Sequence, residues 1–368
     1  MERDELAAWL RLALTPGIGN ITARKLLAAF GLPQQVFAQS PHAFEGMLTA
    51  SQLAALRAEP EGWASQVEAT WQWLQQEGCR MLTLADAQYP APLLQTEDPP
   101  LMLYVMGAQP PSWPRAVAVV GSRNPTPQGL VNARQFSQSL AQAGLTVVSG
   151  LALGVDGAAH EGALQGAAPG QVATIAVVGT GLDRVYPRRH LALAHQVAAR
   201  GLLVSEYPLG TPPLAPNFPK RNRIIAALSQ GTLVVEAALQ SGSLITARMA
   251  AEQGKDVFAI PGSIHSAQSR GCHALLKEGA KLVETAQDIL EELRVASPLP
   301  QSDVPGVAEE AVEDPLLDAL GYDPVGLDEL VARTGVAPAT LQARLLELEL
   351  QGQAARLPGG LFQRVASG

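Results

Sequence analysis

The chain has 368 residues, of which 47% are hydrophobic and 16% charged, so it is long enough for two or three domains and too apolar for global disorder. No apolar run of about 18 residues is free of charge or proline, which argues against a membrane-spanning helix. The first residues also lack a secretory signal. Two cysteines, Cys79 and Cys272, cannot build a disulfide framework. Together these features predict a soluble protein of the reducing cytoplasm.

The net charge of −8 is unevenly spread. Residues 284–329 hold thirteen acidic side chains and one basic side chain, so the rest of the chain carries +4. Two segments, Arg184 to His190 and Pro208 to Arg223, are basic and contain no acid. Local charge governs binding more than global charge does, so an anionic partner is compatible with this composition.

Residues 1–80 have the apolar spacing of helices, with one helix over Leu6–Leu14 and another over Ile21–Phe30. The intervening Thr15-Pro16-Gly17-Ile18-Gly19 resembles a helix–hairpin–helix turn, whose N–H groups can contact a DNA backbone. A purely structural hairpin fits equally well, because little basic charge lies nearby. We expect a helical domain here, of the helix–hairpin–helix or SAM-like type.

The segment 81–293 is expected to form one extended Rossmann-like domain. Its first part, 81–114, is rich in proline and has two weak strands, 81–84 and 101–105. Short apolar runs then alternate with helical stretches, which is typical of a doubly wound, mostly parallel sheet covered on both faces. These runs are Ala116–Val120, Leu145–Val148, Val172–Val178, Leu202–Val204, Thr232–Val235, Val257–Ile260 and Lys281–Val283.

Residues 294–313 are acidic, contain prolines, and are expected to form a linker. Residues 314–368 have the order helix, turn, helix and hairpin, which predicts a winged helix. The recognition segment 338–350 carries Arg344 against Glu347 and Glu349. A helix that reads a DNA groove needs more cationic or amide groups, so we expect this module to pack on another protein surface.

Glycine and serine are concentrated in the loops that leave the carboxyl ends of the predicted strands, where ligands bind in open parallel sheets. These loops are 121–124, 149–150, 179–183, 205–207 and 236–243. They predict a phosphate-binding rim, although tight turns also favour glycine. Neither a dinucleotide fingerprint nor a P-loop occurs, so NAD and ATP sites are disfavoured.

The segment Asn217–Arg223 places three cations beside Phe218, ahead of a helix expected to start near Ile224. Lys and Arg neutralise phosphates, and an aromatic ring can stack on a base. This combination suits single-stranded nucleic acid. The alternative is a solvated basic turn with Phe218 in the core.

Catalytic patterns are sparse. Asp156 and His160 share a helical face, and Glu206 and Glu236 lie near strand ends, but a capping acid and a hydrogen-bonded histidine explain the first pair as well. The histidines and cysteines show no zinc spacing. We therefore predict no catalytic residues, no metal and no cofactor.

The ordered motifs of the chain resemble those of the DNA-processing protein A (DprA, or Smf) family, over residues 1 to 368 and most strongly over about 115–285. The motifs are Val120-Gly121-Ser122-Arg123, Ser149-Gly150-Leu151-Ala152, Gly179-Thr180-Gly181-Leu182-Asp183, Tyr186-Pro187, Ser205-Glu206-Tyr207-Pro208, Phe218-Pro219, Arg221-Asn222-Arg223-Ile224-Ile225, Val235-Glu236-Ala237, Ser241-Gly242-Ser243-Leu244, Ile260-Pro261-Gly262 and Gly271-Cys272-His273.

The resemblance implies a non-enzymatic mediator of natural transformation (competence) and recombination. Such a protein binds incoming single-stranded DNA, protects it, and loads the RecA recombinase onto it as a homodimer. It also implies contacts to other competence or single-stranded DNA-binding proteins and none to a membrane. Carried over by motif, the expected DNA-binding residues are Gly121, Ser122, Arg123, Ser149, Gly150, Asn217, Phe218, Lys220, Arg221, Asn222, Arg223, Ser241, Gly242 and Ser243.

The family's dimer surface corresponds here to the region 264–281, with Ile264, Leu275 and Leu276 as expected contacts; packing in the core explains the two leucines equally well. Two rival functions remain. One is a Rossmann-like nucleotide-hydrolysing enzyme of the phosphoribohydrolase type, using Glu236 to stabilise a sugar cation. The other is a duplex-DNA regulator acting through the winged helix.

Overall fold

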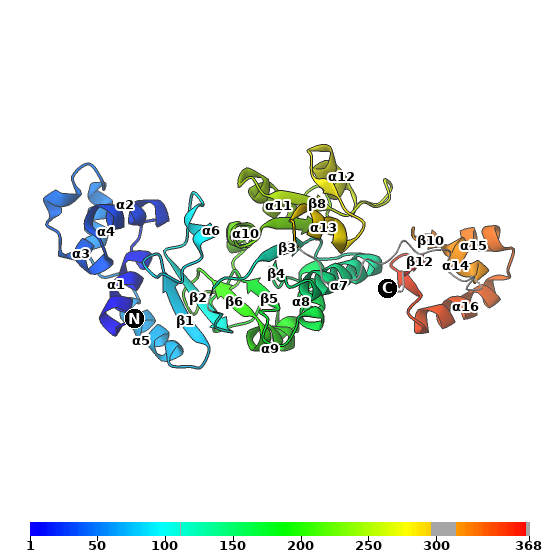
Figure 1. Ribbon diagram of the computed structural model, residues 1–368, viewed down its shortest axis with the longest axis horizontal. Coiled ribbons are helices and arrows are strands. Elements are labelled where there is room, and N and C mark those ends of the chain that lie inside the picture. The colour runs from blue at the N-terminus through cyan, green and yellow to red at the C-terminus, as the bar shows by residue number, and fades with distance from the viewer. Residues whose placement is uncertain (111, 296–313, 366–368) are drawn as a thin grey trace.

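The computed structural model describes residues 1–110, 112–295 and 314–365. Figure 1 shows three parts along the longest axis: a helical end, a central sheet covered by helices, and a small module at the C-terminal end. Within the described residues, no helix is both long enough and apolar enough to cross a membrane.

The helical end consists of short helices around a core that includes Leu6, Trp9 and Leu10, all at most 1% exposed. The two expected helices are confirmed, and Gly17 in the turn between them has a φ of +76°, which favours glycine. The helices are α1 (Arg3–Leu14), α2 (Asn20–Phe30), α3 (Pro33–Ala38), η1 (Pro41–Phe44), α4 (Ala50–Arg57) and α5 (Trp63–Leu74).

The central sheet has nine strands in the order β1-β2-β6-β5-β4-β3-β7-β8-β9. β1 and β2 are antiparallel additions at one edge, and the strands from β6 to β9 are parallel. Every expected apolar run forms a strand, so the fold class is confirmed. The strands are β1 (Cys79–Thr83), β2 (Met102–Gly107), β3 (Ala116–Val120), β4 (Thr146–Ser149), β5 (Thr174–Val177), β6 (Leu202–Ser205), β7 (Gly231–Val234), β8 (Asp256–Ala259) and β9 (Lys281–Leu282).

Helices cover both faces of the sheet. One face packs on α7 (Pro127–Gln142), α8 (Val155–Gly166), α9 (Leu191–Arg200) and α13 (Ala286–Glu292). The other packs on α6 (Ala91–Leu94), α10 (Asn217–Leu228), α11 (Ser243–Glu252) and α12 (Arg270–Lys277). A short helix, η2 (Arg188–His190), precedes α9. The chain moves outward from β3 to β6, then returns to β7 on the other side of β3, so β3 and β7 flank a topological switch point.

The helical end is joined to the sheet by a shared core. The apolar cluster that contains Trp9 and Trp73 continues without a break to Val117 in the centre of the sheet. At the junction the rings of Trp73 and Tyr104 meet edge to face, with centroids 5.7 Å apart. The helical end is therefore packed on the β1–β2 edge.

The C-terminal module is a winged helix with its own small core, as the order of its elements predicts. Its elements are α14 (Pro315–Leu320), β10 (Val325–Gly326), α15 (Leu327–Thr334), α16 (Pro338–Leu350), β11 (Ala354–Leu357) and β12 (Leu361–Arg364). The predicted linker, apart from its first two residues, lies outside the described part of the chain.

Candidate nucleic-acid interface

A pocket of about 480 Å³ opens at the switch point between β3 and β7. The loops after these strands meet there, because the Ser122 amide donates to the Glu236 carbonyl at 2.7 Å. We call this cavity the switch-point pocket. Its polar and charged lining residues are Ser122, Arg123, Asn124, Asp156, Arg221, Asn222, Gln240, Ser241, Ser243, Thr246 and Gln268.

The rim of the pocket on the β7 side carries hydroxyl and amide groups at the start of α11. The Ser241 and Ser243 hydroxyls lie 2.7 Å apart, and Asn222 donates to the Gly242 carbonyl at 3.3 Å. The amides of residues 243–245, the first of the helix, already donate to the Ser241 hydroxyl and to the Ser241 and Gly242 carbonyls. The rim therefore offers hydroxyl and side-chain amide groups to a phosphate oxygen.

The pocket floor contains a buried arginine near a buried carboxyl group. Arg221 is 4% exposed, and its guanidinium donates to the Val177 carbonyl, while its Nε has no protein partner. Burial lowers the pKa of Arg221 to about 10, so it stays charged at neutral pH. Burial raises the pKa of Asp156, and the nearby Arg221 charge opposes that shift. The floor is thus a fixed positive centre partly balanced by one carboxyl.

Aromatic rings and exposed cations lie at the mouth of the pocket. The rings of Phe218 and Tyr186 have centroids 5.6 Å apart, and the Arg123 guanidinium lies 5.6 Å from the Phe218 centroid. Tyr186 is 48% exposed, Arg123 and Lys220 are exposed, and Phe218 is half-buried. Phe218 is therefore not in the core, and its ring and neighbouring cations are accessible to a base and its phosphates.

The basic segment is helical, contrary to the expectation that it precedes a helix starting near Ile224. α10 begins at Asn217, because Pro219 falls in the first turn, where a missing N–H removes no intrahelical bond. Asn217 anchors that turn: its Nδ2 donates to the Gly179 carbonyl at 3.0 Å, and its own carbonyl accepts from the Tyr207 hydroxyl at 3.3 Å.

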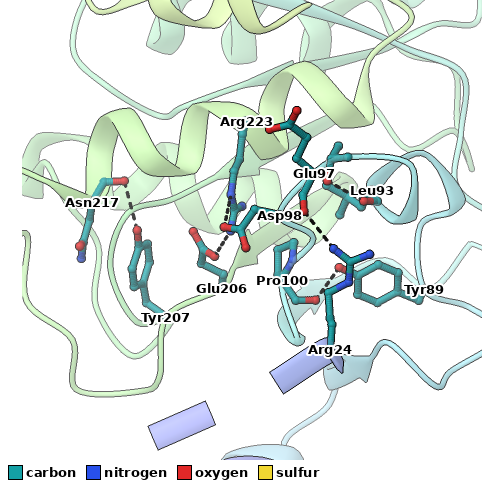
Figure 2. Close-up of polar contacts among 11 residues, drawn as sticks. Arg24, Tyr89, Leu93, Glu97, Asp98, Pro100, Glu206, Tyr207, Asn217 and Arg223 are labelled. Atoms are coloured by element: carbon teal, nitrogen blue, oxygen red, sulfur yellow. Dashed lines mark hydrogen bonds and ion pairs between the residues drawn. The ribbon is translucent and has the colours of Figure 1, made fainter. Parts of the chain in front are cut away.

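Arg223 points away from the pocket. Figure 2 shows its guanidinium between Glu206 and Asp98, and its Nε lies 3.4 Å from an Asp98 carboxylate oxygen. The preceding residue, Glu97, accepts from Arg24 of α2 through its carbonyl at 2.9 Å. Side-chain exposure is 12% for Arg223 and 6% for Glu206. This cation therefore connects α10 to the 97–98 segment and not to the pocket.

Ser149 and Gly150 lie beneath the pocket and do not line it. The Ser149 hydroxyl donates to the Val119 carbonyl at 2.6 Å, and Gly150 packs directly against the Arg221 guanidinium. The structure thus brings together the expected residues of the 121–123 loop, Phe218, Arg221, Asn222 and the 241–243 loop. Of the other expected residues, Ser149, Gly150 and Asn217 support this arrangement through contacts outside the pocket lining. Lys220 is exposed, and Arg223 is bound to Glu206 away from the pocket.

Sequence reasoning missed several lining residues. Gln240 and Gln268 border the pocket, and Gln268 donates to the Asn124 carbonyl at 3.1 Å. Gln240 adjoins the Ser-Gly-Ser motif and could have been included. Gln268 comes from a loop after β8 that carries no local signal. Tyr186 was noted only as part of a motif, yet its ring contacts Phe218.

The residues considered for catalysis have structural partners. His160 is fully buried, and its Nδ1 lies 2.6 Å from the Thr174 hydroxyl. Glu236 accepts from the Thr126 amide and hydroxyl at 2.9 and 2.6 Å. Glu206 is bound to Arg223. β6 and β7 are four strand spacings apart, about 19 Å, so Glu206 and Glu236 do not form a carboxylate pair.

Within the described residues, no group of three or more His, Cys, Asp or Glu side chains is placed to hold a metal ion. Cys79 and Cys272 are buried and unpaired. Of the expected dimer contacts, Leu275 is 5% exposed and belongs to the core, whereas Ile264 is 74% exposed, and Leu276 is partly buried against that core. Only Ile264 and part of Leu276 are available to a second chain.

Comparison with known proteins agrees with this architecture. A family model described as DNA recombination-mediator protein A matches residues 80–294, and one described as the DprA winged helix domain matches residues 297–360. The chain belongs to the DNA recombination-mediator protein A family.

Among its relatives, Protein Smf of Escherichia coli is 43% identical over 302 residues, 80% of each chain. The solved structure of DNA processing protein A from Streptococcus pneumoniae covers 79% of this chain and 98% of its own, with 36% identity and a TM-score of 0.67. The protein from Helicobacter pylori, whose structure concerns its single-stranded DNA binding mode, covers 58% of this chain and 96% of its own, with 32% identity and a TM-score of 0.52.

Proposed function

We propose that this chain is a cytoplasmic, non-enzymatic recombination mediator that binds single-stranded DNA at the switch-point pocket. The observation that carries the proposal is the mouth of the pocket, where the Phe218 ring lies near the Tyr186 ring and the Arg123 guanidinium. Lys220, two residues after Phe218, is exposed. An unpaired strand offers both phosphates and free base faces, and these side chains match both. The single-stranded DNA binding of the Helicobacter pylori protein supports the same assignment.

The proposed binding path divides between the pocket and the surface beside it. Phosphates meet the serine hydroxyls at the start of α11 and the positive floor formed by Arg221. Bases stack on Phe218 and Tyr186. Arg188 and Arg189, exposed in η2 just after Tyr186, extend the basic surface for the neighbouring nucleotides. Such a site has little sequence preference, because its contacts are to the backbone and to ring faces.

The test is fluorescence anisotropy with labelled single-stranded and duplex oligonucleotides over a salt series. We expect tighter binding of the single strand, with an affinity that falls steeply as salt rises. Equal affinity for the duplex would instead favour the winged helix as the DNA-binding element. Affinity that does not respond to salt would contradict phosphate neutralisation at the pocket.

We further propose that the chain acts as a homodimer, protects the bound strand and delivers it to RecA, in natural transformation, together with other competence or single-stranded DNA-binding proteins. Membership of a recombination-mediator family supports this role. The test is whether RecA forms filaments faster on single-stranded DNA pre-bound by this protein, with an Arg123→Ala chain as control. Equal stimulation by both chains would show that the effect on RecA does not depend on the proposed DNA site.

Glu236, on which the enzyme alternative depends, has structural partners. Glu236 is bound to Thr126 at the start of α7, and a side-chain carbon added at Gly129 would lie 2.5–2.7 Å from its carboxylate, so the carboxylate is held against α7. A hydrolysis assay with nucleoside monophosphates, scored by release of free base, tests this directly. We expect no release above that of a Glu236→Gln chain.

A further inference from the structure

Helix α16 carries a narrow apolar stripe that faces solvent. Leu341, Leu345 and Leu348 are at most 3% exposed and form the core of the winged helix. On the opposite side of the helix, residues at spacings of four, three and four are exposed, and at 100° per residue they lie within a 60° arc. We call this set the α16 stripe; it consists of Ala339, Ala343, Leu346 and Leu350.

The α16 stripe does not have the chemistry of a DNA-reading surface. Leu346 is 56% and Leu350 82% exposed, whereas a recognition helix places cationic or amide side chains on its free face. The cation of this helix, Arg344, is already bound to Glu347 and to Asp314, at 2.8 and 2.7 Å. A repeat of apolar residues at four-three-four spacing is the pattern by which one helix packs along another.

Residue size along the stripe specifies the orientation of the partner helix. The two small residues lie in the first half of α16 and the two large ones in the second half. We propose that the stripe packs antiparallel on the same stripe of a second copy of this chain, with Ala339 opposite the second copy's Leu350 and Ala343 opposite its Leu346. In such a two-fold interface each large residue meets a small one and the surfaces interdigitate. Parallel pairing would set alanine against alanine and leave gaps.

The polar flanks of the helix fit the same register. Glu347 comes beside the second copy's Thr340, and Glu349 beside its Gln342, so each acid faces an exposed neutral side chain. Glu347 is also neutralised within its own chain by Arg344. Contact between like charges would be destabilising, and none occurs in this register.

The interface is small, so its strength depends on how close the two chains are. A single helix face buries less than the roughly 800 Å² per partner of a standard interface, which makes pairing weak between free chains. Two chains bound near each other on one DNA strand experience an effective concentration on the order of millimolar. The α16 stripe would then favour adjacent binding, a consequence that rests on the proposed function.

The test is disulfide trapping in the full-length chain without DNA. Cys79 and Cys272 are buried, so an introduced cysteine is the accessible thiol. Chains carrying Ala339→Cys and Leu350→Cys are oxidised separately and as a mixture. We expect a covalent dimer in the mixture only, because two copies of either position would lie about 16 Å apart along the antiparallel pair, beyond the roughly 7 Å that a disulfide spans.

A chain with Asp328→Cys, exposed on α15, measures random collision. Cross-linking of the mixture at or below that level would overturn the proposal, and so would efficient cross-linking of either chain alone, which indicates parallel pairing. Light scattering at rising concentration is the second measurement: Leu346→Glu/Leu350→Glu should lower the average mass, and an unchanged mass contradicts self-pairing. Because DNA is absent throughout, failure here leaves the proposed DNA site untouched.

Discussion

Gly150 and Arg221 fit together so tightly that the first must be glycine for the second to occupy its position. A Cβ added at Gly150 would lie 2.1–2.3 Å from three atoms of the Arg221 guanidinium. The residue following β4 thus sets where the positive charge of the pocket floor lies, although it does not line the pocket itself.

Gly150→Ala should therefore destabilise the protein and weaken its binding to single-stranded DNA. Displacing Arg221 strains the packing and separates a buried charge from its carbonyl partner, at a cost of about 2–5 kcal/mol. Urea unfolding measures the loss. Gly19→Ala is the control, because a Cβ there meets nothing within 4 Å; similar costs for the two substitutions would contradict the argument.

Phe218→Ala should reduce affinity for oligo-dT by the loss of one stacked base, about 1–3 kcal/mol. Tyr322→Ala is the matched control, because Tyr322 is 53% exposed and has the Arg364 guanidinium 5.3 Å from its ring centroid, but belongs to the winged helix. Anisotropy titrations compare the two. Equal losses would place base stacking outside the switch-point pocket.

Arg123→Ala and Lys220→Ala should weaken binding to all sequences alike and lower the salt dependence. Each lost phosphate contact reduces the slope of log affinity against log salt by about 0.7 for a single strand. The control is Lys277→Ala, which removes an exposed cation of α12. Unchanged affinity of both pocket variants for oligo-dT would count decisively against this site.

Arg223→Ala should destabilise the fold by about 3–5 kcal/mol, because it leaves the buried Glu206 carboxylate unpaired. Replacing both partners, as Arg223→Met/Glu206→Leu, should restore most of that loss. Since Arg223 is bound to Glu206 and Asp98 and does not line the pocket, the double variant should keep the salt slope of the unmodified chain. A slope reduced by about 0.7 would instead identify Arg223 as a phosphate contact.

Acid should destabilise the protein through His160. Burial, with smaller contributions from the charges of His190 and Arg221, lowers the pKa of His160 from 6.5 to about 3. Below pH 6.5 His160 is therefore protonated in the unfolded chain but stays neutral in the folded chain. The free energy of unfolding falls as pH drops towards 3, by up to about 1.4 kcal/mol per pH unit. His160→Gln should flatten urea-unfolding stability between pH 6.5 and 4; an unchanged pH dependence would exclude His160 as its source.

The alternating apolar runs were sufficient to predict the sheet, because a strand covered on both faces must be apolar along its length. The run Ala116–Val120 coincides with β3. The glycines and serines after the strands also predicted the edge at which the switch-point pocket lies, since the carboxyl ends of parallel strands share one edge. The sequence did not reveal the direction in which each basic side chain of α10 points.

The direction of each side chain depends on what α10 packs against on each of its sides. Phe218 and Arg221 face the pocket, whereas Arg223 turns to carboxylates contributed by the 97–98 segment and by the loop after β6. Because the carboxylates lie far from Arg223 in sequence, no local pattern predicts that they pair with it. The chain's own pattern therefore determined the fold and the edge that carries the pocket, and only long-range packing decided which charges line that pocket and which hold the fold together.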